Sequence, residues 1–178
     1  KKITASAGLH GIIDPSGEVL VDVGGAMNFD MIATNYYHVA DIVIDGAQSM
    51  GAITNYTFTN VTANHTIDAG FSADLTANAT PVWWLVQYGL GTNVADVIRD
   101  DDGDGLLNWE EYVLGTVPLT SLSRFDIEIS ESNGTVVVHY NTVAADGTGY
   151  KGVDRYYDLQ DCSDLTPGPW QPVPGYTN

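Results

Sequence analysis

Near its middle the chain reads Asp100-Asp-Asp102-Gly-Asp104-Gly105-Leu106-Leu-Asn108-Trp-Glu-Glu111. Three aspartates stand at alternate positions, a glycine follows the third, and a glutamate closes the run. Calcium takes six to eight oxygen ligands, and twelve-residue loops supply them from positions 1, 3, 5, 7, 9 and 12, with glycine at position 6. The stretch therefore predicts an EF-hand-like calcium loop between two short helices.

Each constrained position of that loop holds a suitable residue. Carboxylates fill positions 1, 3, 5 and 12, a backbone carbonyl serves position 7, and an amide stands at position 9, which is often reached through water. The predicted metal ligands, in chain order, are Asp100, Asp102, Asp104, Leu106, Asn108 and Glu111. Gly105 lies where the backbone turns sharply and a side chain would be strained. The alternative, an acidic solvated turn, would not require a particular residue at each of these positions.

The composition is that of a folded protein with an acidic surface. Hydrophobic residues make up 44% of the 178 residues, and 6 basic against 23 acidic residues give a formal net charge of −17. Such a surface repels phosphate backbones, which argues against nucleic-acid binding, and it attracts divalent cations. No run reaches the roughly 20 apolar residues of a membrane helix, so we expect no membrane span.

The single cysteine, Cys162, excludes a disulfide within the chain and a cysteine-built zinc site. We interpret it as a buried apolar side chain. No signal peptide is recognisable, as in a mature secreted protein. Because weak calcium sites suit the high calcium concentration outside cells, we expect an extracellular or cell-surface protein.

Residues 1–73 are predicted to form a module of short antiparallel strands, because apolar and polar residues alternate between turn residues. Turns are expected at 14–17 and at Asp45-Gly46. Strands this short must pack on one another as a small barrel or sandwich. The expected strands are Lys2–Ala7, Glu18–Val23, Asn28–Ala33, His38–Ile44, Asn55–Val61 and His65–Phe71.

The same module resembles the divergent internalin-type B-repeat of bacterial surface proteins. The matching stretches are Ile3-Thr-Ala-Ser-Ala7, Gly11-Ile-Ile-Asp-Pro15-Ser-Gly17, Tyr37-His-Val39, Val43-Ile-Asp45-Gly46 and Tyr56-Thr-Phe58-Thr-Asn60-Val-Thr62-Ala-Asn64-His-Thr66-Ile67. This resemblance implies a spacer or adhesion module without catalytic residues.

Residues 80–118 are predicted to form a helix–calcium loop–helix linker. Helices are expected at Val82–Tyr88 and Asn108–Leu114, each stopped by a glycine. The stretches Thr80-Pro-Val-Trp-Trp-Leu-Val-Gln-Tyr-Gly89, 100–112 and Gly115-Thr116-Val117-Pro118 resemble the thrombospondin type 3-like linker of bacterial secreted proteins. That family usually places acidic residues where Val117 and Leu119-Thr120 stand here. We therefore expect a single calcium ion.

Residues 122–178 are predicted to form a second β-domain. Its expected strands are Phe125–Ser130, Thr135–Asn141, Tyr156–Asp161 and Trp170–Val173. The stretches Tyr157-Asp-Leu159-Gln-Asp-Cys-Ser-Asp-Leu165 and Pro169-Trp170-Gln-Pro-Val173 resemble a fibronectin-like β-sandwich, in which another strand normally follows. We expect that last strand to be missing. The predicted fold is thus mainly β, with two small antiparallel β-domains joined by the calcium hand.

Catalytic residues are not recognisable, so we expect no enzymatic activity. The histidines are scattered and lack the spacing of a zinc pair or a nearby nucleophile; they are His10, His38, His65 and His139. Trp83, Trp84 and Trp109 either form a sugar-stacking platform or pack the short helices against a neighbouring β-domain. Five Asn-X-Ser/Thr sequons are either glycan acceptors or ordinary turn and strand residues; they are Asn55, Asn60, Asn64, Asn78 and Asn133.

Two functional hypotheses follow. The first is a non-enzymatic, calcium-rigidified extracellular structural protein that assembles head to tail into a filament, with Lys1–Ala7 as a donor strand for the incomplete sandwich of the next subunit. The second is an accessory, spacer or carbohydrate-binding module of a larger secreted enzyme or adhesin. A carbohydrate-binding role predicts that Trp109 or Trp170 is exposed beside polar residues.

Overall fold

The computed structural model of the protein describes residues 1–143, 155–157, 159–161 and 169–174. Cys162 lies outside these residues. The fold is mainly β, with 40% strand and 11% helix, which confirms the predicted fold class at that level. The chain divides into two compact units, Lys1–Val97 and Ile98–Asn178, and the division falls inside the predicted linker.

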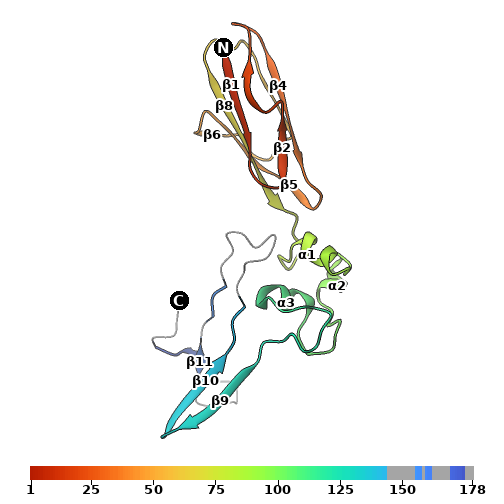
Figure 1. Cartoon of the computed structure of the whole chain (residues 1–178), viewed down its shortest axis with the longest axis vertical. Helices are drawn as coiled ribbons and strands as arrows, with labels where there is room; N and C mark the ends of the chain where they lie inside the picture. Colours follow the sequence, from red (N-terminus) through yellow and green to blue (C-terminus); the bar gives the residue numbers. More distant parts are fainter. Residues whose placement is uncertain (144–154, 158, 162–168, 175–178) are drawn as a thin grey trace. The chain divides into compact units, whose positions relative to one another are not determined.

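The first unit contains two β-sheets (Figure 1). The five-stranded sheet has the order β3-β1-β8-β5-β6, and the three-stranded sheet has the order β2-β4-β7. The strands of the larger sheet are β1 (Lys2–Ala7), β3 (Gly17–Leu20), β5 (Tyr37–Ile44), β6 (Gln48–Ser49) and β8 (His65–Ala73). Those of the smaller sheet are β2 (Gly11–Asp14), β4 (Met27–Ala33) and β7 (Asn55–Phe58). Each strand predicted in this unit overlaps an observed one, although β3 and β7 end three residues before the predicted ends, at Leu20 and Phe58. The short β2 and β6 were not predicted.

The first strand, β1, lies inside the larger sheet and corrects two expectations. It pairs with β3 in antiparallel fashion and with β8 in parallel, with Ile3 opposite both Val19 and His65. The all-antiparallel prediction is therefore wrong for this pair, which joins the first and last strands of the unit by a long crossover. The prediction that Lys1–Ala7 serves as a donor strand is also wrong, because both edges of β1 are already hydrogen-bonded and Ile3 is fully buried.

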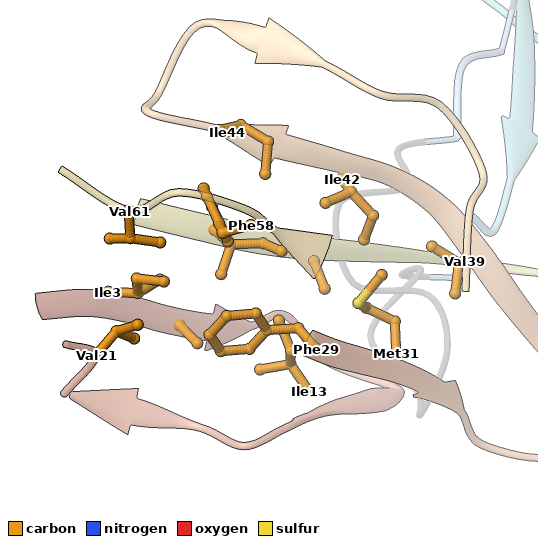
Figure 2. Close-up of a cluster of buried hydrophobic side chains, with 13 residues drawn as sticks. Ile3, Ile13, Val21, Phe29, Met31, Val39, Ile42, Ile44, Phe58 and Val61 are labelled. Atoms are coloured by element: carbon orange, nitrogen blue, oxygen red, sulfur yellow. The ribbon is translucent and has the colours of Figure 1, made fainter. Parts of the chain in front are cut away.

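Both sheets contribute to one apolar core. Figure 2 shows the labelled side chains of this core pointing toward one another between the strands. The cluster consists of Ile3, Ala5, Ile13, Val21, Phe29, Met31, Val39, Ile42, Ile44, Phe58, Val61, Ile67 and Ala69. A bulge between Val39 and Asp41 shifts the register of β5. It lets Val39 and Ile42 both face the core although they are three residues apart.

Two short helices complete the first unit. α1 (Val82–Gln87) is the first predicted helix, and it begins where the backbone N–H of Val82 donates to the carbonyl of Asp74 at 2.8 Å. Trp84 and Leu85 are its buried residues. Gly89 follows with a φ of 69°, as a glycine stop requires. α2 (Val94–Val97) was not predicted, and its first turn is capped by the side chain of Asn93.

The described part of the second unit contains α3 (Asn108–Leu114), with the bounds predicted from the sequence, and two small sheets. β9 (Ile127–Ser132) and β10 (Thr135–Tyr140) form a hairpin, and β11 (Gln160–Asp161) pairs with β12 (Gln171–Pro172). Asn133 and Gly134 at the hairpin turn both have positive φ, which matches the twist of a two-residue hairpin loop. The sandwich and its missing last strand stay predictions.

No helix in the described ranges is long and apolar enough to cross a membrane.

Candidate metal centre

The loop before α3 is folded by its own aspartates. The carboxylate of Asp100 accepts hydrogen bonds from the backbone N–H groups of Gly103, at 2.7 Å, and Gly105, at 3.0 Å. The Asp102 side chain accepts one from the N–H of Asp104, at 3.1 Å. Gly105 has a φ of 100°, a conformation that side chains disfavour, as expected for the sharp turn. The chain thus curls around the side chains at positions 1, 3 and 5.

These three aspartates converge on one point. One carboxylate oxygen from each of Asp100, Asp102 and Asp104 lies within 4.8 Å of the other two. The Oδ2 atoms of Asp102 and Asp104 are buried and have no hydrogen-bond partner within the described part of the chain. Buried carboxylate oxygens without donors are costly, so this arrangement favours a bound cation.

Glu111 faces the same region from the first turn of α3. It is fully buried, and its Oε2 likewise finds no hydrogen-bond donor among the residues that the structure describes. Its Oε1 accepts only a long hydrogen bond, 3.4 Å, from the hydroxyl of Thr116. Glu111 lies outside the tight aspartate group, but burial, Asp102 and Asp104 raise its pKa to about 7. The site therefore disfavours four negative carboxylates unless a positive charge joins them.

The remaining predicted ligands lie in the same loop. Leu106 donates its backbone N–H to Asp104 at 2.8 Å, and Asn108 is fully buried at the start of α3. Glu110 accepts a hydrogen bond from the N–H of Leu107 at 2.8 Å, which fixes the first turn of the helix. The structure thus brings the predicted ligand residues together in one loop, whereas calcium binding itself stays a prediction.

Two residues of this region form a contact that was not predicted from the sequence. Arg99 precedes the loop and contacts the carboxylate of Asp101 with its Nε at 2.6 Å and its Nη2 at 3.0 Å. Asp101 also accepts a hydrogen bond from the amide nitrogen of Asn108 at 2.7 Å. The signal was present in the sequence as a basic residue two positions before an aspartate, but the calcium-loop pattern assigns neither position a role.

The donor set selects a class of metal. Carboxylates and amide or backbone oxygens are hard ligands, which suit calcium, magnesium or manganese rather than zinc or copper. Calcium tolerates flexible geometry and a high ligand number, whereas magnesium requires a compact octahedron and keeps several waters. The predicted ligands from Asp100 to Glu111 belong to this hard class, and calcium as the bound ion stays a prediction.

Three of the described histidines take part in other contacts. His38 pairs with Asp74 and His65 with Asp45, each through Nδ1 at 2.8 Å, while the ring of His10 stacks on Tyr37. Within the described ranges, one group of acidic, histidine or cysteine side chains is close enough together to hold a metal ion. It consists of the three loop aspartates.

The tryptophans differ in exposure. Trp84 is 2% exposed, so it cannot take part in the surface platform that was considered with Trp83 and Trp109. Trp170 is 59% exposed beside the exposed Gln171. A carbohydrate-binding role therefore stays a prediction for Trp170. The asparagines of all five sequons are exposed, and glycan attachment stays untested; they are Asn55, Asn60, Asn64, Asn78 and Asn133.

Comparison of the chain with protein-family models, with curated proteins and with solved structures gives no match. The resemblances to the B-repeat, the calcium linker and the fibronectin-like sandwich therefore stay predictions, and the assignment of a function rests on the geometry of the loop.

The raised pKa of Glu111 predicts how the calcium-free protein responds to pH. Because the folded state holds this proton more tightly than the unfolded chain, the stabilisation is present at low pH and is lost as pH rises through about 7. In chelator, we expect a higher Tm at about pH 5.5 than at about pH 8. Thermal denaturation monitored by circular dichroism tests this, with Glu111→Gln as the variant that abolishes the difference. An unchanged difference in that variant would assign the effect to another group.

Proposed function

We propose that this chain is a calcium-binding structural module of an extracellular β-rich protein, with one calcium ion in the loop from Asp100 to Glu111. The observation that supports it most is the burial of Glu111 against the three loop aspartates, with carboxylate oxygens that lack donors among the described residues. A hard divalent cation supplies the missing charge and the missing partners at once.

A structural role is supported by the distribution of the core. Among the described residues, the fully buried apolar side chains all belong to the first unit, apart from Pro118. Within the described part of the second unit, the other buried residues are polar, namely Asn108, Glu111 and Thr116. A unit whose described part buries so few apolar groups would gain stability from a metal that binds only its folded form.

Contacts around α3 support the same role. Arg155 donates its Nε to the carbonyl of Val113 at 2.7 Å and its Nη1 to the carbonyl of Val143 at 2.8 Å. Its guanidinium also lies against Gly115, where an added Cβ would come within 2.8 Å. A cation at the C-terminal end of α3 stabilises the unpaired carbonyls of that helix. Calcium at one end of α3 and Arg155 at the other would thus hold the second unit together.

An extracellular location and a non-enzymatic role complete the proposal. The acidic surface has a net charge of −17 and attracts divalent cations. A calcium loop of weak affinity suits the calcium-rich exterior of cells. The loop side chains are engaged in folding the loop or are buried, which suits a site that binds and stabilises rather than one that turns over substrate.

Calcium removal is expected to loosen the loop and α3 selectively. Hydrogen exchange of the full chain should show amides of 100–118 exchanging at least about tenfold faster in chelator than in excess calcium, because the carboxylates then repel one another. Amides of β1 and β8 serve as the internal control, since they are held by the apolar core. Equal protection of 100–118 in both buffers, with no heat of calcium binding by calorimetry, would reject the proposal.

A further inference from the structure

Asp101 is surrounded by donors and has no place among the ligands of the loop pattern. Its side chain is 15% exposed, and both of its oxygens accept hydrogen bonds. Oδ1 accepts from the Nε of Arg99, and Oδ2 accepts from the Nη2 of Arg99 and from the Nδ2 of Asn108, at 2.6, 3.0 and 2.7 Å. All three contacts are donated by nitrogen atoms, so the carboxylate of Asp101 is the acceptor in each of them.

A carboxylate whose two oxygens accept from the Arg99 guanidinium fixes the orientation of the Asn108 amide. It can only accept hydrogen bonds, so the end of the amide that faces Asp101 must be the NH2 group. The planar amide then carries its Oδ1 on the side away from that contact. Oδ1 is buried, and Asn108 stands at position 9 of the loop, where an oxygen is required.

Arg99 contacts Asn108 directly as well as through Asp101. Its backbone carbonyl accepts a hydrogen bond from the N–H of Asn108 at 2.9 Å, and its side chain donates to Asp101 from two nitrogens. Paired contacts of this kind between a guanidinium and a carboxylate are strong and directional. Backbone and side chain of Asn108 are therefore both positioned from Arg99.

We propose that the Arg99–Asp101 pair is a positioning device that presents Oδ1 of Asn108 to the calcium ion and thereby sets the calcium affinity of the loop. The proposal rests on the calcium-binding function proposed above. Groups that orient metal ligands without touching the metal typically contribute about 10- to 100-fold in affinity. Arg99 and Asp101 act here in that way, although neither is a ligand.

The loss of charge and the loss of positioning predict opposite changes in calcium affinity for the Arg99→Gln variant. Arg99→Gln removes a positive charge close to the site, which by Coulomb's law alone would tighten calcium binding. If Arg99 positions Asn108 through Asp101, the same variant weakens calcium binding by about tenfold. The sign of the change therefore separates the two effects without any further assumption.

The chain offers a matched control for the lost charge. Arg124 forms an ion pair with Asp126, at 2.9 Å, with the same two-residue spacing in the same unit. Arg124→Gln should leave the calcium affinity unchanged or slightly higher. Asp101→Asn should weaken binding, because an asparagine no longer forms the charged pair with Arg99 and no longer forces the amide of Asn108 into one orientation.

The experiment is calcium titration of the full chain by calorimetry, with a double-mutant cycle on Asn108→Ala. In the Asn108→Ala background, Arg99→Gln should no longer weaken binding, since the positioned oxygen is gone. Circular dichroism and the Tm in chelator establish that each variant folds, and Arg99→Lys, which keeps the charge but not the paired contact, provides a milder change. If the wild-type protein binds calcium and the Arg99→Gln variant binds it with equal or higher affinity, the positioning role alone is overturned. Wild-type protein that binds no calcium would overturn the proposed function as well.

Discussion

Replacing Glu111 with glutamine is expected to weaken calcium binding by about 100-fold or more, because even groups that only orient a ligand contribute 10- to 100-fold. Glu111 is buried and closes the loop at position 12, where the ligand normally provides two oxygens and one negative charge. Glutamine has nearly the same shape, so the change removes charge and one strong ligand oxygen while it keeps the packing. Calcium titration by calorimetry measures the loss directly.

The same variant should behave differently without calcium. Because burial and the loop aspartates disfavour the charge on Glu111, the neutral glutamine relieves repulsion in the empty site. The Tm of Glu111→Gln in chelator should therefore equal or exceed that of the unsubstituted chain at about pH 8. Its Tm should no longer rise when calcium is added, since a ligand stabilises a protein only to the extent that it binds the folded form.

Glu110→Gln is the matched control, because it makes the same chemical change one residue away. Glu110 closes the first turn of α3 on the N–H of Leu107, and glutamine can make that hydrogen bond too. Its calcium affinity should stay within about threefold of wild type, since small surface charge changes act weakly at this range. Equal losses for both variants would mean that net charge, and not the ligand position of Glu111, governs binding.

Replacing Phe29 with alanine is expected to destabilise the first unit by about 3–5 kcal/mol. Phe29 lies on β4, is fully buried, and meets the ring of Phe58 edge to face at a centroid distance of 5.9 Å. Truncation removes this contact and leaves a cavity between the two sheets, which the surrounding strands can fill only in part. Urea denaturation monitored by hydrogen exchange at β1 and β8 measures the change within this unit.

Ile32→Ala on the same strand is the control for Phe29→Ala. Ile32 is 53% exposed, so the loss of its side chain removes little buried area and should cost less than about 1 kcal/mol. Similar costs for the two variants would show that the core of this unit is not centred on Phe29.

The sequence by itself determined the features that depend on neighbouring residues. The bounds of β1 and α3 follow from alternation, from the loop pattern and from the glycine at position 115, which takes a φ of 80° as a helix stop. The loop positions were also predicted from the sequence. Asp100, Asp102 and Asp104 stand at alternate positions, and one carboxylate oxygen from each lies within 4.8 Å of the others. These features are local, so short-range backbone geometry and hydrogen bonding decide them.

Only the tertiary structure decided the features that join distant residues. The parallel pairing of β1 with β8, which removes Lys1–Ala7 as a donor strand, depends on how the chain crosses between sheets, and alternation within one strand does not encode its partner. The bulge in β5 is likewise a matter of pairing with β8. Glu111 is buried, with a pKa of about 7, because the loop folds against α3. The same fold brings Arg99 into contact with Asp101. Residue types predict which groups favour a cation, but desolvation and orientation arise from packing, and packing is set by the whole chain.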